Sequence, residues 1–379
     1  MKTYLFSFLL AVSSMIGCKN ILNNSNSMLP YYIDLEKDID RIKSIPLSTF
    51  GSKLEYIPLE TGSDFLIKSV DNIFINDSFI FIGDYNQRLL LFDINGKYLR
   101  QIGKIGKGPG EYQSVENFVV GNKQKEIYIL SYREVNIFDF TGQFKRDFRL
   151  DFPCSEIIMD DNGDLILHPF SSAQPTTDPV YSWYVYDNKG TEKTKILNTS
   201  KRINGGITVP YSPLYMFNGT PHFMEFGIDT LYNYSDNLKL PYAIFNYGKM
   251  KYPVDPTLSE SLSIDDKIWV SKIQEIKDLL LVNVWWGRDS ILNCVFSKSS
   301  SDFAVINETG FTNDIDSGMN FWPRKIINDN LMIDFKDAFE LIAFSNNYQI
   351  NSKEQSNRIK EIINHLSETS NPVIIILRN

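Results

Sequence analysis

The feature of this sequence that most limits its fold is a short motif that recurs along the chain. Residues 91–96, 137–142 and 185–190 each read apolar, aromatic, Asp, any two residues, Gly, and successive copies begin 46 and 48 residues apart. A further 46 residues on, residues 231–234 continue the series with Asn in place of Asp. The Asp side chain can accept a backbone N–H two residues on, and Gly adopts a positive φ without strain, so each copy predicts a β-hairpin. The predicted turn residues are Asp93, Gly96, Asp139, Gly142, Asp187 and Gly190.

The strands around these turns predict an all-β ring. Earlier apolar runs precede the first three copies at residues 79–82, 127–130 and 165–167, and they are nearly continuous instead of alternating. Antiparallel strands of that kind are covered on both faces, as in radially stacked propeller blades. A period of about 46–50 residues suits a four-stranded blade. Residues 50 to 345 then divide into a six-bladed β-propeller of four-stranded antiparallel blades, although the last two blades are poorly marked and five or seven blades remain open.

One helix interrupts the β pattern near the end of the chain. Apolar residues at 359, 362, 363 and 366 form one stripe at helical spacing, and Ser352 with Gln355 forms a capping box. Asn371-Pro372 ends this segment, and an apolar run at residues 373–377 follows. We therefore expect a helix over about 352–368, inserted in the last blade before a C-terminal strand. A strand near residues 54–59 is expected to complete the same blade, since a ring leaves no long edge unpaired.

The N-terminus predicts export. Lys2 precedes a nine-residue apolar run at residues 4–12, which has the length of a signal-peptide core and is too short to span a bilayer. The run leads to Gly17-Cys18, which resembles the lipobox of bacterial lipoproteins, so Cys18 is the expected lipidation site; an ordinary secretory signal is the alternative. The predicted organisation is a signal peptide over 1–17, a lipidated cysteine and flexible tether over 18–40, and the propeller over 41–379.

The sequence resembles known families both in a single repeat and over most of the chain. Residues 80–96 resemble the repeat of NHL propellers, and residues 103–112 look like the connector between their blades. The chain from about 40 to 379 resembles a family of bacterial six-bladed β-propeller lipoproteins; the further matching segments are residues 54–60, 229–232, 320–324 and 371–377. The resemblance implies a fold and an address in the cell envelope. It supplies no catalytic residues.

Composition and motifs exclude several classes of function. The 38 basic and 46 acidic residues give a net charge of −8 with no basic stripe, so we expect no nucleic-acid partner. The three histidines are far apart and no cysteine pair has metal-ligand spacing, so we predict neither a metal site nor a cofactor. Residues 103–110 lack the Lys-Ser/Thr ending of a phosphate loop. A calcium loop starting at Asp160 would need a glutamate at its twelfth position, where Ser171 stands, so both segments are predicted turns. Cys154 and Cys294 are expected to be buried free thiols.

The candidate binding residues are tryptophans and arginines in two segments. Pro323 holds the preceding residue, Trp322, in an extended conformation. If a strand begins there, the side chain of Arg324, two residues after Trp322, would point to the same face of the strand. Trp285, Trp286 and Arg288 form the second, weaker candidate. Trp and Arg are enriched in binding hot spots, although packing between blades is the competing interpretation.

These observations together predict a non-catalytic binding or scaffold module for a protein or a glycan, held in the cell envelope by its lipid. The expected location is the outer membrane, facing the periplasm or the cell surface. The alternative is a propeller hydrolase or lyase that holds a cation with carboxylates in its central channel. The sequence leaves the ligand, the oligomeric state and the presence of catalysis open.

Replacing Cys18 by Ala tests the predicted anchor. Because the thiol is the atom that would carry the lipid, Cys18→Ala should release the protein from the membrane fraction or leave it unprocessed. Cell fractionation and the mass of the mature N-terminus are the measurements. Normal maturation with unchanged membrane association would contradict the prediction.

Overall fold

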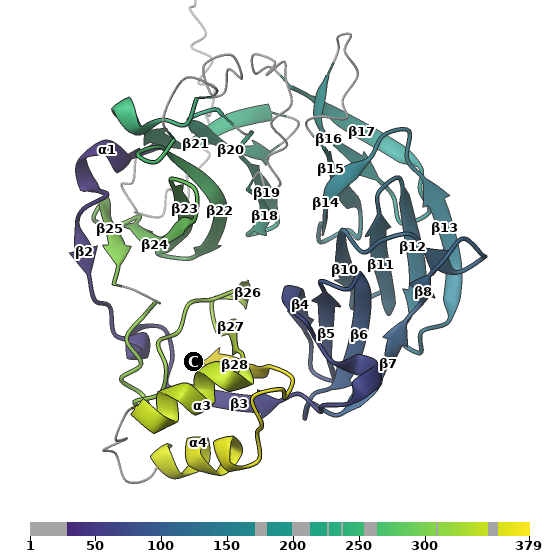
Figure 1. The fold of residues 1–379 in the computed structure, drawn as a ribbon. Coiled ribbons are helices and arrows are strands. Elements are labelled where there is room, and N and C mark those ends of the chain that lie inside the picture. Colours follow the sequence, from purple (N-terminus) through teal and green to yellow (C-terminus); the bar gives the residue numbers. More distant parts are fainter. Residues whose placement is uncertain are drawn as a thin grey trace, which may run out of the picture.

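Six β-sheets are arranged around a common axis in the computed structural model of the chain (Figure 1). The structure describes residues 29–170, 180–198, 213–225, 227–235, 238–253, 264–307, 310–347 and 355–379. The predicted signal peptide and Cys18 lie outside these residues. The architecture is therefore the predicted one: a six-bladed propeller whose blades each contain four antiparallel strands.

In each blade the first strand lies at the axis and the fourth at the rim (Figure 1). The strands are, for blade 1, β4 (Val70–Ile75), β5 (Phe79–Asp84), β6 (Arg88–Asp93) and β7 (Tyr98–Ile102); for blade 2, β10 (Asn117–Gly121), β11 (Glu126–Ser131), β12 (Glu134–Asp139) and β13 (Phe144–Arg149); for blade 3, β14 (Cys154–Met159), β15 (Leu165–Pro169), β16 (Tyr181–Tyr186) and β17 (Glu192–Leu197); for blade 4, β18 (Leu214–Phe217), β19 (Thr220–Phe223), β20 (Thr230–Ser235) and β21 (Leu238–Asn246); for blade 5, β22 (Ile268–Ile276), β23 (Leu279–Trp286), β24 (Ser290–Ser297) and β25 (Asp302–Ile306); and for blade 6, β26 (Lys325–Asn328), β27 (Leu331–Lys336), β28 (Val373–Arg378) and β3 (Lys53–Pro58).

The ring closes through blade 6, which combines the two ends of the propeller. β3 pairs antiparallel with β28 along its whole length, from Lys53 opposite Arg378 to Pro58 opposite Val373. The predicted N-terminal strand thus completes the last blade. The six inner strands contact one another in the order β4, β10, β14, β18, β22, β26 and back to β4, so the blades form a closed ring around the axis.

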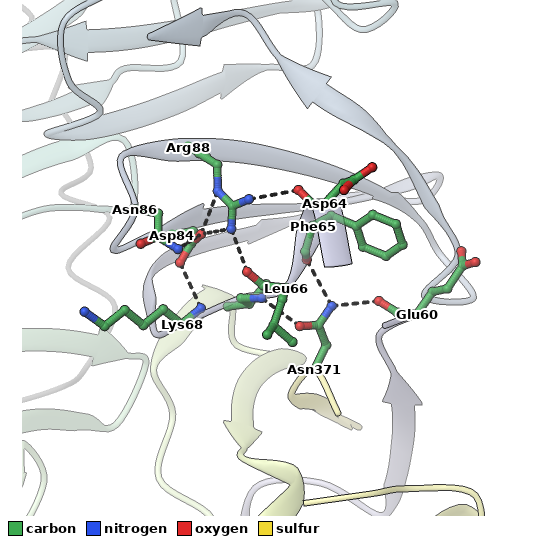
Figure 2. Close-up of polar contacts among 10 residues, drawn as sticks. Glu60, Asp64, Phe65, Leu66, Lys68, Asp84, Asn86, Arg88 and Asn371 are labelled. Atoms are coloured by element: carbon green, nitrogen blue, oxygen red, sulfur yellow. Dashed lines mark hydrogen bonds and ion pairs between the residues drawn. The ribbon is translucent and has the colours of Figure 1, made fainter. Parts of the chain in front are cut away.

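A buried asparagine joins this closure to blade 1 (Figure 2). The Asn371 side chain, which is fully buried, accepts from the Ile67 N–H at 2.7 Å and donates to the Glu60 carbonyl at 2.7 Å. The segment that it holds is also bound by Arg88, whose guanidinium donates to the Leu66 carbonyl at 2.6 Å and pairs with the Asp84 carboxylate. The connection from blade 6 to blade 1 is therefore fixed from both sides.

The repeated hairpins have the predicted geometry at equivalent places. Each joins the third and fourth strands of its blade, and Gly96, Gly142 and Gly190 have φ values of 86°, 83° and 88°. The Asp93 and Asp139 side chains each accept the backbone N–H two residues on, at 2.9 Å. Asp187 does the same at 2.8 Å. Residues 160–164 form another hairpin turn, as predicted, between β14 and β15.

Two regions carry more structure than the sequence predicted. The sequence predicts a flexible tether up to residue 40, but β1 (Tyr31–Asp34) pairs parallel with β21, and α1 (Leu35–Asp38) follows. Ile33 and Leu35 are fully buried against blades 4 and 5, which explains why this segment belongs to the folded domain. β2 (Ile42–Lys43) extends blade 5 in the same parallel manner.

The predicted helix corresponds to α4 (Gln355–Asn364), and residues 352–354 at its expected start lie outside the described part. A further helix, α3 (Ala338–Asn347), precedes it and packs beside it (Figure 1). The glycine-rich connector contains β8 (Lys104–Ile105) and β9 (Glu111–Tyr112). Cys154 and Cys294 are buried free thiols, as expected.

Alanine substitutions at two of the repeated glycines should differ in cost. Both Gly96→Ala and Gly142→Ala impose a left-handed conformation on a residue with a Cβ, at about 1–2 kcal/mol. At Gly96 the new Cβ would also lie 2.3 Å from the Pro58 carbonyl oxygen in β3, whereas at Gly142 its nearest neighbour is a side-chain carbon of Arg100 at 3.3 Å. We therefore expect Gly96→Ala to lower the free energy of unfolding more than Gly142→Ala.

Chemical denaturation measures both costs. Gly108→Ala is the control, because its φ is not positive and its nearest neighbour is the flexible Glu111 carboxylate at 3.2 Å. Equal losses for the Gly96 and Gly142 variants would show that the contact with β3 carries no energy.

Candidate functional site

A row of polar side chains crosses three adjacent inner strands at the axis. The Asn72 amide in β4 donates to the Asn117 amide oxygen in β10 at 2.5 Å. The Asn117 amide in turn donates to the Glu156 carboxylate in β14 at 2.6 Å. All three residues are half-buried although they lie on the innermost strands, so solvent reaches the axis at this level.

These three residues occupy the same position in their blades. Each lies on its inner strand three residues before a residue that pairs with the second strand. Those pairs are Ile75 with Ile80, Val120 with Ile127, and Met159 with Leu165. The ring therefore superimposes three copies of one repeat position into a continuous row, which we call the amide–carboxylate row.

Two lysines lie on the inner strands of two other blades. Lys272 is on β22 and Lys325 is the first residue of β26, in blades 5 and 6. The Lys272 ammonium donates to the Arg324 carbonyl at 2.7 Å. In the described part of the chain, the Lys325 ammonium has an electrostatic partner in Glu156 but no hydrogen bond. The amide–carboxylate row, Lys272 and Lys325 together form what we call the axial site.

The charges of the axial site influence one another through the ring. Burial raises the pKa of Glu156 to about 7, against the opposing effects of its hydrogen bond from Asn117 and of the two lysines. Burial, together with repulsion from Lys325 and Arg324, lowers the pKa of Lys272 to about 8. Burial also lowers the pKa of Lys325. These mutual effects place the two ammonium groups within electrostatic range of the Glu156 carboxylate.

A second polar cluster, between blades 4 and 5, shows the contrast with a purely structural network. There the Glu275 carboxylate is bound by Tyr215 at 2.8 Å, by Tyr242 and by the Lys298 ammonium at 2.5 Å. Lys298 also donates to the Ile276 carbonyl at 2.8 Å. Glu275 and Lys298 are buried, and their polar groups are bound within the protein. The axial site differs because several of its polar groups still have bonding capacity.

The structure corrects the prediction for Trp322. Its side chain is 3% exposed and packs against Phe311 at a ring-centroid distance of 5.4 Å, so its face is not available to a ligand. Arg324 is 55% exposed and lies over the Phe335 ring, 3.6 Å from Asp334. The two side chains do not share a surface because β26 begins only at Lys325, so the alternation of a strand does not apply to residues 322–324.

The second predicted group lies at another level of blade 5. Trp285 stacks on Trp269 of β22, with ring centroids 5.5 Å apart and planes at 2°. Trp286 packs against the core between blades 4 and 5, and Arg288 is exposed and paired with Asp265 at 3.2 Å. Trp269 precedes Lys272 by three residues, about 10 Å along a strand. The structure therefore does not unite this group with the axial site.

A small cavity of about 20 Å³ adjoins this aromatic group. Its lining includes Trp269, Tyr252 and the buried Glu225. The Glu225 Oε1 atom has no hydrogen-bond partner in the described chain. The cavity has the volume of about one water molecule, so it does not hold an organic ligand as it stands.

Sequence reasoning missed the axial site. Asn72, Asn117 and Glu156 belong to no motif, and they are 45 and 39 residues apart. Their common register is the signal that would have found them, had the blades been aligned on their inner strands instead of on the hairpin turns. The lysines carry no such signal, because blades 5 and 6 lack the clear Asp-x-x-Gly turn.

The described residues offer neither a metal-binding cluster nor a helix that could span a membrane. No group of three or more His, Cys, Asp or Glu side chains among them could hold a metal ion. None of the helices in the described ranges combines the length and apolar character needed to cross a bilayer.

The raised pKa of Glu156 predicts a pH-dependent stability. Because this pKa is about 7 in the folded protein and 4.5 for an ordinary glutamate, the folded state binds more protons between these values. The contribution of Glu156 to stability is therefore greatest below pH 4.5 and decreases as the pH rises to about 7. Glu156→Gln should remove this decrease, whereas Glu116→Gln, at an exposed glutamate, should not.

Unfolding in denaturant at a series of pH values between 4.5 and 8 measures this effect. Lys272, Lys325 and Asn117 are the groups that bear on Glu156, and both variants retain them. If the wild-type and Glu156→Gln proteins show the same slope between pH 5 and 7, Glu156 does not titrate in that window.

Comparison with known proteins places the chain in a family and a fold. No curated protein matches the sequence. Among solved structures, one from Bacteroides fragilis, described as a "Putative exported protein", has 16% identity and a TM-score of 0.69, and the match covers 92% of this chain and 99% of that one. A member of the DUF4221 family from Bacteroides vulgatus has 12% identity and a TM-score of 0.47, covering 67% and 84% of the two chains. The family model described as "Domain of unknown function (DUF4934)" matches residues 30–378, and the chain belongs to that family.

Proposed function

We propose that this protein is an exported binding module that holds a glycan or protein ligand at the axis of its propeller and releases it chemically unchanged. The observation that carries the proposal is the axial site, where inner strands of five blades contribute a hydrogen-bonded row and two lysines within electrostatic range of it, with unused bonding capacity among the described residues. Convergence of side chains from several elements on one solvent-accessible point is typical of ligand sites. The similarity to a structure described as an exported protein supports the cellular part of the proposal.

The proposed location follows from the N-terminal sequence. A lipid on Cys18 would anchor the module in the cell envelope, and we propose the outer membrane as its site. The folded domain begins at β1, only about a dozen residues after Cys18. The proposed tether is therefore short, and the ring would stay close to the membrane surface.

The geometry favours binding over hydrolysis at a bound cation. In the amide–carboxylate row, Asn72 Oδ1 accepts from the Ile73 N–H at 2.9 Å, and Asn117 Oδ1 accepts from both Asn72 and Phe118. These amide oxygens are engaged within the protein, and the nearby lysines repel a cation. Glu156 is then the only carboxylate of the row, whereas hard cations are held by several oxygen ligands.

A binding panel that also monitors chemistry tests the proposal. The purified full-length protein is titrated with neutral and acidic oligosaccharides and with peptides, and each bound ligand is recovered and analysed by mass spectrometry. We expect at least one ligand to bind saturably and to return intact, and the Asn117→Leu variant to lose that binding because it interrupts the row. Recovery of cleaved ligand would show an enzyme and overturn the proposal.

A further inference from the structure

The unused hydrogen-bonding groups of the axial site are almost all donors. The amide oxygens of Asn72 and Asn117 are engaged, but each NH₂ group has two hydrogens and uses one in the row. The Lys272 ammonium uses one of its three hydrogens, and the Lys325 ammonium uses none within the described chain. Among the described residues of the site, the side-chain acceptor that remains is the second oxygen of Glu156. A ligand that satisfies this site must therefore bring acceptors.

The charges point to the same ligand chemistry. The Lys272 and Lys325 ammonium groups both act electrostatically on the single Glu156 carboxylate. The Arg324 guanidinium also acts on Lys272, and it lies 3.6 Å from an Asp334 carboxylate that Lys336 binds more closely, at 2.8 Å. The site is thus cationic inside a protein whose net charge is −8, so an anion is attracted locally to the axis and not to the body as a whole. The mutual repulsion of Lys272 and Lys325 is a cost that a bound anion would relieve.

Resting on the proposed binding function, we propose that the axial site selects ligands carrying an oxyanion group, a carboxylate or a sulfate, which is bound by the ammonium groups of Lys272 and Lys325. The free N–H groups of Asn72 and Asn117 bind acceptor oxygens elsewhere on the ligand. Both oxyanions offer the same acceptor geometry to ammonium donors, and sugars and peptides can carry either.

Substitutions with opposite effects on the site's charge provide the test. Isothermal titration with glucuronate, glucose 6-sulfate and neutral glucose compares the oxyanions with each other and with an uncharged sugar. We expect both charged sugars, or one of them, to bind at least about tenfold more tightly than glucose, with affinity falling as NaCl increases. Lys325→Met should weaken that binding by about tenfold or more, since it removes a charge-assisted hydrogen bond. Lys325→Arg should retain it.

Glu156→Gln should act in the opposite direction and strengthen anion binding, because it removes the only negative charge of the site. Lys189→Met, at an exposed lysine in the outer hairpin of blade 3, changes the net charge by the same amount and should leave the affinity unaltered. Thermal unfolding of each variant confirms that the ring is intact. A structural role for these residues would not produce opposite shifts at Lys325 and Glu156.

The outcomes separate this inference from the proposed function. Equal binding of glucose and the charged sugars, or no saturable binding of either charged sugar up to about 10 mM, overturns the inference. If a neutral oligosaccharide or peptide of the panel still binds and returns intact, the binding function remains. If a charged sugar derivative binds at Lys325 and is cleaved, anion selection remains and the non-catalytic function is lost.

Discussion

The pairing of β3 with β28 is the interaction on which the rest of this structure depends. A propeller blade buries both faces only if it has a neighbour on each side, so an open ring would expose one face of blade 1 and one of blade 6. Here the strands pair over residues 53–58 and 373–378, and Asn371 extends the closure by hydrogen bonds to the connection into blade 1 (Figure 2). The two ends of the domain therefore stabilise each other, although they are more than 300 residues apart in sequence.

Closure also determines what can happen at the axis. Once the inner strands form a continuous circle, equivalent residues of successive blades lie side by side, and hydrogen bonds can run from Asn72 through Asn117 to Glu156. The same circle brings Lys325 of blade 6 into the electrostatic range of Glu156 in blade 3. The axial site exists only in the closed ring, so its integrity and the stability of the fold are linked. The network around Glu275 shows that the same ring can also use its buried charges to join neighbouring blades.

The tryptophans show that residue type alone does not predict whether a side chain binds a ligand or packs in the core. Residue type suggested that Trp322 lies at a binding surface, but a tryptophan satisfies packing and recognition equally well, and only the position of β26 decides between them. Trp285 stacks on Trp269, a partner that lies in another strand and could not be assigned before the register of β22 and β23 was known. The polar residues that do converge are ordinary asparagines, lysines and a glutamate, which carry no motif.

The sequence by itself determined the repeat, the blade fold and the hairpin turns, because these depend on local properties: a positive φ at Gly96, Gly142 and Gly190, an Asp that accepts nearby N–H groups, and apolar runs that need cover on both faces. It also indicated which strand closes the ring, since an unpaired edge is costly for any order of the blades. Only the tertiary structure decided that residues 31–39 join blades 4 and 5, that Trp322 is buried, and that Glu156 lies within electrostatic range of Lys272 and Lys325. Those contacts join residues of different blades, and their partners are chosen by the register and curvature of the whole ring, which no short segment of sequence encodes.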